Sequence, residues 1–539
     1  MTGFLNLDLL RAHAAPRDRW PDRARAALAR PHLVAQWERA SDGHLVCRWR
    51  IDDQMPSQWR RLGSWPALFV PIPPASTPRR VMTSDIRVLA ADTALPVTYT
   101  EGLEGRLRDR LRIQRLRAGR KTFANRLALG LALVGPGLLV MLGDNDAGGV
   151  ITYAQTGATY GISLFIPLMI PLAFIAYLVQ EMTIRLGAVT RRGHAEMIWR
   201  RYGKFWGAFS LIDLVAANIL TLMTEFIGVR VASAVFHVPY LLTIPLAFAF
   251  VVGVLVFLNY CTWERIALFI AAFNVVFVPL ALFSHPEWVA IGRTFTGASG
   301  WAVPGGVLSA SFLILVSANF GTTIAPWQLF FQQSCVVDKG LLVKDIKASR
   351  RDLMLGVFGM AAVAMAIIVL SGQYLHGLPN ASSLDDDTVV RAIGQHLGQG
   401  AMVVFALGLL EAGLIAAIVI TASTAWAIGE ALDVPRSVNV SPHRSVYFYA
   451  PAVLGTAIAA GTLMLPHVPI SFLNLTVQVI ATIFMPAAML FLLMLLNDRE
   501  LIGEHANTPL RNALSIGVMV LLILCNGLYG ISTMFPNAL

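Results

Sequence analysis

The chain has 539 residues, of which 56% are apolar and only 14% are charged. A soluble globular protein carries about 25% charged residues, so this composition excludes a disordered protein, a fibrous protein and an ordinary cytosolic enzyme. The four cysteines lie far apart with no CxxC or Cys/His spacing, which supports neither a disulfide framework nor a zinc site. Long apolar runs indicate a polytopic, all-α membrane protein.

The net charge of +10 belongs to the beginning of the chain. Residues 1–126 hold 23 basic and 12 acidic side chains, whereas the rest of the chain holds 19 basic and 20 acidic ones. Residues 1–120 are expected to form a small soluble α+β domain, because apolar and polar residues alternate over 45–51 and short apolar runs follow. The first twenty residues lack a signal-peptide pattern, so this domain is predicted to be cytoplasmic.

A basic stretch, residues 106–121, joins this domain to the first apolar segment. One interpretation is a helix that binds anionic lipid, at about 1 kcal/mol per basic residue near the surface. The simpler interpretation, which we favour, is that these basic residues only orient the first span with its N-terminal side in the cytoplasm. Nucleic-acid binding is not expected, because the stretch adjoins a membrane span and contains no interleaved aromatic residues.

Residues 127–535 are predicted to form the membrane domain. It contains eleven apolar segments, each long enough for the roughly 20 residues that a span requires. The predicted spans are residues 129–159, 162–187, 206–235, 240–259, 265–284, 305–333, 353–375, 401–432, 447–465, 471–496 and 511–531. Basic residues concentrate in the loops after spans 2 and 6. The positive-inside rule therefore predicts a multi-pass plasma-membrane protein with a cytoplasmic N-terminus and an external C-terminus.

Spans 1 and 6 are interrupted by polar residues near their middle. Span 1 breaks at GDNDAGG (143–149), and span 6 breaks at SANFGTTIAP (317–326). Each broken span begins a group of five, and paired broken helices in two halves indicate an inverted-repeat transporter with its site at the membrane midplane. The fold class expected is therefore a LeuT-like 5+5 inverted repeat with eleven transmembrane helices, preceded by the small soluble domain.

The residues in the breaks favour a cation as the ligand. Asp144 and Asp146 place two carboxylates near the bilayer centre, and neither break contains Lys or Arg. Unpaired charges at this depth cost several kcal/mol, which a divalent ion would offset. The alternative is that one or both aspartates cap half-helices at their N-termini, where a negative charge is favourable; Asp144 is the stronger candidate for that role.

These segments resemble the Nramp family of divalent-metal transporters. The first break resembles the family motif Asp-Pro-Gly-Asn, with Asp146 on the Asp and Gly149 on the Asn, and GTTIAPWQLFFQQS resembles the segment Ala-x-x-Met-Pro-His. Thr322, Ala325 and Trp327 then fall on the Ala, the Met and the His. LTVQVIATIF resembles the family's span 10 and contributes Gln478. The resemblance covers about 130–530 and implies a transported divalent metal, with no resident cofactor and no enzymatic activity.

The resemblance implies a metal site with Asp146 as its principal ligand, and gives secondary or gating roles to a second group. The expected site residues are Asp146, Gly149, Thr322, Thr323, Ala325 and Gln478. The secondary group is Asp144, Asn145, Asn319, Glu225 and Trp327. For Asn319, Gln478 and Glu225 a purely structural role, bonding broken backbone or a neighbouring helix, remains an alternative, as it does for Glu411 in span 8.

The chain departs from the family at the ligands themselves. The family's Asn and soft Met thioether become Gly149 and Ala325, which offer no side-chain ligand. Oxygen ligands suit magnesium, calcium and manganese, and magnesium usually keeps several waters, so a wider, oxygen-lined site favours magnesium, with manganese as the second candidate. The same replacements occur in Nramp-related magnesium transporters, which this chain resembles most.

The groups that carry protons in the family are also changed. Trp327 stands where the family has a His in span 6, and Leu222 stands where the family has an acidic residue three positions before Glu225. These replacements predict transport of Mg²⁺ or Mn²⁺ without proton coupling. Three alternatives remain open: a proton-coupled manganese/iron symporter, a sodium-coupled carrier of an organic solute on the same fold, and a non-transporting metal sensor that signals through residues 1–120.

Overall fold

The computed structural model describes residues 33–39, 45–51, 135–297, 301, 303, 305–377 and 386–534. The chain divides after Thr100 into two units. In the first unit, β1 (Leu33–Arg39) pairs antiparallel with β2 (Leu45–Ile51), with Leu33 opposite Ile51. The alternating stretch 45–51 is thus a strand, as predicted. The rest of the expected N-terminal domain and the basic stretch 106–121 lie outside the described residues, so the domain assignment stays a prediction.

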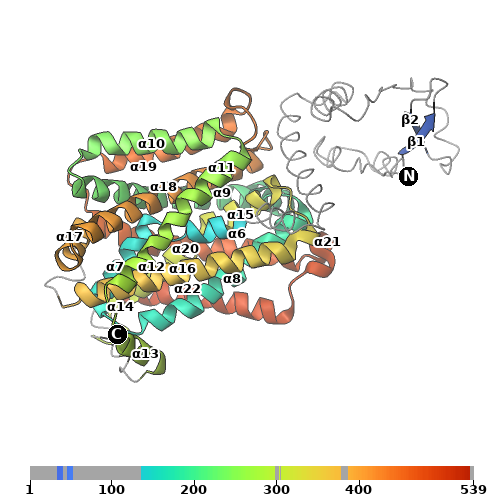
Figure 1. The fold of residues 1–539 in the computed structure, drawn as a ribbon. Helices are drawn as coiled ribbons and strands as arrows, with labels where there is room; N and C mark the ends of the chain where they lie inside the picture. Colours follow the sequence, from blue (N-terminus) through green and yellow to red (C-terminus); the bar gives the residue numbers. More distant parts are fainter. Residues whose placement is uncertain are drawn as a thin grey trace. The chain divides into compact units, whose positions relative to one another are not determined.

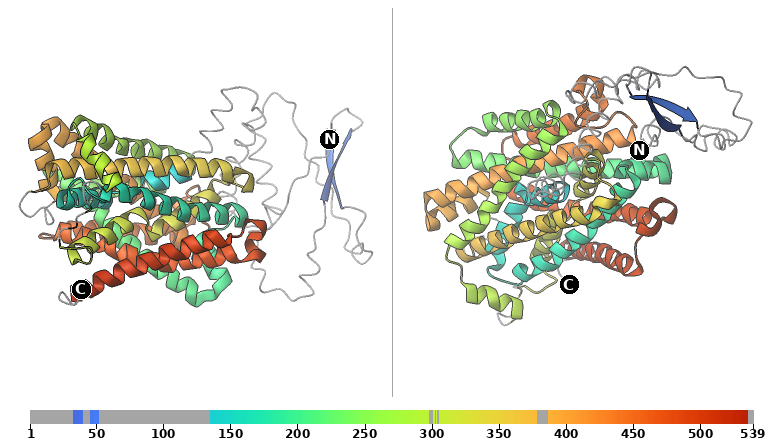
Figure 2. Two further views of the ribbon diagram at one scale, coloured as in Figure 1. Left: turned by 90° about the horizontal axis from the view of Figure 1, so that it is seen from below. Right: turned by 45° about the vertical axis from the view of Figure 1, so that its right-hand side comes forward.

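The described part of the second unit is almost entirely helical (Figure 1). Its first half contains α6 (Pro136–Leu142), α7 (Ala147–Tyr160), α8 (Phe165–Thr190), α9 (His194–Val235), α10 (Tyr240–Phe257), α11 (Tyr260–Ala272), η3 (Phe273–Val276) and α12 (Phe277–Phe283). Its second half contains α14 (Ala310–Thr323), α15 (Pro326–Asp338), η4 (Val343–Asp345), α16 (Ile346–Tyr374), α18 (Gln399–Ala431), α19 (Val446–Leu463) and α20 (Ile470–Asn497). The helix α22 (Pro509–Met534) follows as a peripheral span, seen as the long red helix in Figure 2.

Shorter helices occupy the loops between these spans. They are α13 (Trp288–Thr296), α17 (Asp386–Leu397), η6 (Pro442–Arg444), α21 (Arg499–Ile502) and η7 (Gly503–His505). The first part of α9 is also a loop helix, because Gly203 adopts a φ of 85° and bends the chain before the span proper begins. A positive φ of this kind is strained for residues with a side chain.

Ten of the eleven predicted spans are confirmed in the described residues. Ten helical stretches are long and apolar enough to cross a membrane, and the short helices α6 and α7 lie where the first predicted span was expected. Both predicted breaks are present, but they are shorter than the expected 143–149 and 317–326. The first spans only 143–146, because α6 ends at Leu142 and α7 begins at Ala147. The second spans only 324–325, because residues 317–323 continue α14 and Pro326 begins α15. Each break lies within a buried stretch, where unwound backbone is tolerated because protein surrounds it.

Close helix packing places the first break against α9 and α18. A Cβ atom on Gly228 of α9 would lie 2.5 Å from the Ala147 side chain, and one on Gly413 of α18 would lie 2.5 Å from the carbonyl oxygen of Glu225. Larger residues at these two positions would force the helices apart. The two glycines therefore bring Glu225 to the beginning of α7, where the candidate site lies.

Polar contacts join alternate loops at each end of the helices. At one end, Gln333 of α15 donates to the Arg192 carbonyl (2.9 Å) in the loop after span 2, and Arg185 of α8 donates to that of His505 (2.8 Å) after span 10. These bonds bring the ends of spans 2, 6 and 10 to the same side. At the other, His376 contacts the Ala158 carbonyl (3.1 Å) and Arg230 donates to that of Leu463 (2.9 Å). This alternation is what eleven successive crossings require. We call the first end the loop 2–3 end.

Candidate metal site

Asp146 forms the N-terminus of α7. It is the N-cap residue, and its Oδ1 accepts a hydrogen bond of 2.5 Å from the backbone N–H of Gly149. A carboxylate here satisfies an otherwise unpaired N–H and faces the positive end of the helix dipole. The capping role expected first for Asp144 thus belongs to Asp146, whose second oxygen, Oδ2, takes no part in that bond. Capping and metal binding are compatible.

Glu225 of α9 lies against the same helix terminus. Its Oε2 accepts a hydrogen bond of 3.0 Å from the Ala147 N–H, and its Oε1 accepts one of 3.1 Å from the Thr224 hydroxyl. The bond to Ala147 places the Glu225 carboxyl group beside the residue that follows Asp146. In the sequence, Leu222 replaces the acidic residue expected near Glu225. In the structure, Asp146 at the beginning of α7 lies near Glu225 instead. Local sequence spacing could not have shown this, because the two residues come from different helices.

The second break approaches the first at Gly149. An ideal Cβ atom on Gly149 would lie 2.4 Å from the Thr322 hydroxyl oxygen and 2.9 Å from Asp146 Oδ1. The Thr322 hydroxyl has no hydrogen-bond partner among the described residues. Because Gly149 has no side chain, a carboxylate oxygen and a free hydroxyl oxygen converge over its Cα atom. A cation placed there would meet both.

Gln478 of α20 lies beside the first turn of α7. Its Nε2 would lie 2.4 Å from a Cβ atom on Gly148, and that nitrogen has no partner in the described structure. The backbones of α14 and α20 touch, since a Cβ atom on Gly321 would lie 1.9 Å from the Gln478 carbonyl oxygen. This contact holds the Gln478 amide against both breaks, as expected for a ligand or a residue that positions one.

Ala325 is the N-cap of α15, and Pro326 is the first residue of that helix. Proline is favoured there because its missing N–H would be unpaired in any case. Ala325 is buried and contributes no side-chain donor atom. Thr323, next to it in the expected ligand set, directs its hydroxyl to the Asn319 carbonyl (2.7 Å). The structure therefore assigns the Thr323 side chain to its own helix.

Three residues of the expected secondary group hold structural contacts instead. Asn145 donates to the Met360 carbonyl (3.3 Å), which turns its amide towards α16. Asn319 donates to the Thr156 hydroxyl (2.8 Å) and so ties α14 to α7, as the structural alternative predicts. The Trp327 ring packs on Phe331, with ring centroids 6.0 Å apart, and beneath Gly143. Of these three, none contacts Asp146 through a hydrogen bond in the described residues.

Asp144 lies in the linker between α6 and α7 with its side chain fully buried. Its Oδ1 accepts a hydrogen bond from Gln328 of α15, and Gln328 in turn accepts one of 3.0 Å from Gln180 of α8. Asp144 Oδ2 has no partner among the described residues. Sequence reasoning missed both glutamines; the signals were two amides within apolar spans, one of them in the run WQLFFQQS.

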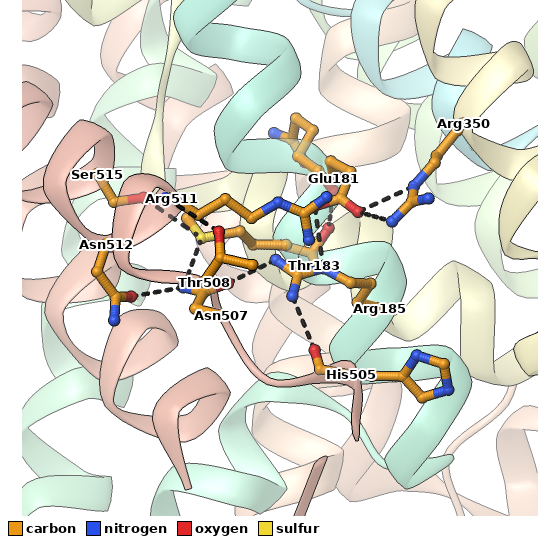
Figure 3. A network of polar contacts seen from close by, with 12 residues as sticks. Glu181, Thr183, Arg185, Arg350, His505, Asn507, Thr508, Arg511, Asn512 and Ser515 are labelled. Carbon is orange, nitrogen blue, oxygen red and sulfur yellow. Dashed lines mark hydrogen bonds and ion pairs between the residues drawn. The ribbon is translucent and has the colours of Figure 1, made fainter. Parts of the chain in front are cut away.

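A largely buried ionic network lies at the loop 2–3 end (Figure 3). Glu181 of α8 accepts hydrogen bonds from Arg185 (3.0 Å) and from Arg350 of α16 (2.9 Å). Arg185 also donates to the Asn507 side chain (2.6 Å) in the segment before α22. The network therefore joins spans 2, 7 and 11 at one point.

The oxygen atoms at the breaks, rather than a cluster of classical ligands, define the candidate site. No group of three or more His, Cys, Asp or Glu side chains that could hold a metal occurs among the residues that the structure describes. The groups gathered at the breaks are the Asp146 carboxylate, the Thr322 hydroxyl, the Gln478 amide and nearby backbone. Hard, oxygen-preferring cations such as magnesium, calcium and manganese fit such a set.

Comparison with known proteins identifies the membrane unit. The family model described as "Natural resistance-associated macrophage protein-like" (Nramp) matches residues 137–532, which is more than half of the chain. The chain belongs to the Nramp family. The resemblance drawn from the two breaks is thereby confirmed, although a special closeness to the magnesium-transporting members stays a prediction.

Several curated Nramp relatives match over most of their length. The divalent metal cation transporter MntH of Erwinia tasmaniensis is 25% identical over 420 residues, which cover 74% of this chain and 93% of that protein. MntH of Aeromonas hydrophila is 24% identical over 406 residues, covering 73% and 94%. These relatives are transporters by name.

The fold is also that of a solved Nramp structure. The manganese transporter of Eremococcus coleocola, in complex with an aromatic bis-isothiourea compound, superposes with a TM-score of 0.63 at 18% identity, covering 77% of this chain and 90% of that one. The expected all-α, LeuT-like architecture of the membrane domain is therefore confirmed.

Proposed function

We propose that this protein transports a divalent metal cation across the membrane by alternating access, with magnesium as its preferred substrate and manganese as the second candidate. Family membership and the names of the MntH relatives support divalent-metal transport. The buried carboxylates of Asp146 and Asp144 between two broken spans support a cation as the substrate.

The single observation that carries the magnesium preference is the convergence of oxygen atoms over Gly149. Asp146 and Thr322 offer oxygen, Gly149 and Ala325 offer no side-chain donor, and no thioether replaces the family's Met at position 325. Thioether and thiolate ligands favour soft metals, whereas magnesium takes oxygen ligands and gives up water reluctantly. A site with two side-chain oxygens, and with the small residues Gly149 and Ala325 beside them, leaves room for a partly hydrated magnesium ion.

We further propose that metal transport proceeds without proton coupling. Coupled symport needs a titratable route away from the metal, and the two family positions that would supply it are Trp327 and Leu222, both buried in packed surroundings. The indole of Trp327 cannot accept a proton.

Proton-coupled symport remains the second candidate, because one observation favours it: Glu225 contacts the Asp146 segment directly. In this arrangement a proton could pass between the two carboxyl groups even without the family's His.

The orientation proposed places the loop 2–3 end in the cytoplasm. The basic residues after spans 2 and 6, including Arg191, Arg200, Lys344 and Lys347, belong to loops at this end, and basic loops remain on the cytoplasmic side. The N-terminus then lies inside and the C-terminus outside.

Flux measurements in liposomes test the proposal. Purified protein is reconstituted, and uptake of magnesium, manganese and calcium is recorded together with lumenal pH. Saturable magnesium uptake that manganese inhibits, with no metal-dependent acidification, is the expected result. Absence of flux for all three ions would contradict the transporter assignment.

A further inference from the structure

A row of buried amide side chains leads from the first break towards the loop 2–3 end. Gln328 and Gln332, one turn apart on α15, face α8, where Gln180 donates to Gln328 Oε1 (3.0 Å) and Thr183 donates to Gln332 Oε1 (3.2 Å). Asp144 lies at the beginning of the row as the acceptor for Gln328. All five side chains are fully or almost fully buried.

The row is incompletely bonded. Asp144 Oδ2, Gln180 Oε1 and Gln332 Nε2 have no hydrogen-bond partner in the described part of the chain. Each unpaired buried polar atom costs about 1–3 kcal/mol, and helices in a membrane pack well through small or apolar residues. Two unsatisfied atoms at the α8–α15 interface, with a third on the adjoining linker at Asp144, are therefore poorly explained by packing alone.

Two of the unsatisfied atoms are oxygens that a cation would bind. Asp144 Oδ2 carries charge, Gln180 Oε1 is neutral, and the Gln328 amide lies between them. Rotation of the Gln328 amide about its last torsion exchanges its nitrogen for its oxygen, which would present a third oxygen to an ion. Asp144 is two residues from Asp146 in the same unwound linker between α6 and α7.

We propose that Asp144, Gln328 and Gln180 form a second cation site, through which a hydrated divalent ion passes between Asp146 and the loop 2–3 end. The inference rests on the proposed metal transport. One carboxylate and two neutral amides hold an ion weakly, and weak binding at successive sites is what permits release. Water completes the coordination sphere, as magnesium requires.

Two variants of Gln180 separate a transit site from a structural contact. Gln180→Leu removes the oxygen, and it is expected to lower the maximal rate of magnesium uptake several-fold with little change in KM, because Asp146 still binds the ion. Gln180→Glu adds a second carboxylate near Asp144 and is expected to bind the ion more tightly. Binding is measured by titration with Mn²⁺ in detergent, followed through the electron paramagnetic resonance signal of Mn²⁺. The expected result is two bound ions per chain in this variant and one in the parent.

Asn526→Leu is the matched control. It also replaces a membrane-embedded amide that has an unsatisfied oxygen, but on the peripheral helix α22, and it should transport as the parent does. Parent-like flux in Gln180→Leu, or a single bound ion in Gln180→Glu, overturns the second site. Absence of flux in the parent protein and in Asn526→Leu overturns the proposed function instead, so the two failures are distinguishable.

Discussion

At the residue scale, Asp146 has two roles that substitution can separate. It caps α7 through Oδ1, and in the proposed site its charge binds the metal. Asn caps a helix about as well as Asp, whereas Ala costs about 1 kcal/mol of stability. Asp146→Asn is therefore expected to fold with a parent-like Tm and to lose nearly all metal flux, because the amide lacks the charge.

Asp146→Ala serves as the comparison and should lose both flux and some thermal stability. Tm in detergent and uptake into liposomes are measured on the same preparations. Parent-like uptake by Asp146→Asn would show that the charge at this position is not required, and it would remove Asp146 as the principal ligand.

Selectivity at the proposed site can be tested by substitution at Gly149, Thr322 and Ala325. Restoring the family's ligands, Asn at 149 and Met at 325, is expected to favour manganese over magnesium by adding an amide oxygen and a thioether. The structure adds a condition, since a Cβ atom at 149 would lie 2.4 Å from the Thr322 hydroxyl. Thr322→Ala, which also restores the family residue, removes that clash.

The triple variant Gly149→Asn, Thr322→Ala, Ala325→Met is thus expected to fold and to shift the ratio of manganese to magnesium flux upwards. Gly149→Asn alone should be poorly stable or inactive. Competition uptake with both ions gives the ratio directly. If the triple variant keeps the parental ratio, ligand softness and cavity size do not set selectivity in this protein.

At the element scale, the Glu181 network links three spans, and we expect it to contribute to the thermal stability of the protein. Removing one partner of a buried ion pair costs about 3–5 kcal/mol, because the other charge is left uncompensated. The Glu181 side chain is only 6% exposed, and two arginines converge on it. Glu181→Gln is therefore expected to lower the Tm of the detergent-solubilised protein markedly.

Arg201→Ala provides the matched control at the same end of the molecule. Arg201 pairs with Asp498 at 2.7 Å, but its side chain is 44% exposed, and exposed ion pairs contribute about 0–1 kcal/mol. Its Tm should stay close to that of the parent. Equal losses in the two variants would mean that burial does not determine the strength of these contacts.

At the scale of the whole molecule, proton coupling is the property that divides the two leading candidate functions. Asp146 titrates, so low pH is expected to inhibit metal uptake by competition for the carboxylate. No stoichiometric proton entry should accompany it, because Trp327 and Leu222 interrupt the family's route. Simultaneous records of metal flux and lumenal pH, with and without an imposed pH gradient, check this expectation.

Acidification in proportion to metal uptake would revive the symport alternative, and Glu225→Gln then identifies the group responsible. If Glu225 exchanges a proton with Asp146, this variant should abolish acidification while metal uptake persists. If acidification persists in Glu225→Gln, another group carries the proton.

The sequence by itself determined the membrane architecture and the position of the two breaks at which we propose the metal site. Spans can be predicted because each must cross a hydrocarbon layer with about 20 apolar residues, and the breaks stand out because Gly, Pro and Asp are rare in such runs. Asp146, Thr322 and Gln478 were found by resemblance, and the structure brings all three to the breaks around Gly148 and Gly149.

Only the tertiary structure decided which atoms are available in that site. It assigned the cap to Asp146, committed Thr323, Asn145 and Asn319 to structural bonds, and placed Glu225 at the beginning of α7. It also joined Gln180 to Gln328, which are 148 positions apart in the chain. The physical reason is that hydrogen-bond partners depend on helix contacts a few ångströms wide, whereas the pattern of apolar residues reports only that a segment is buried, not what it is buried against.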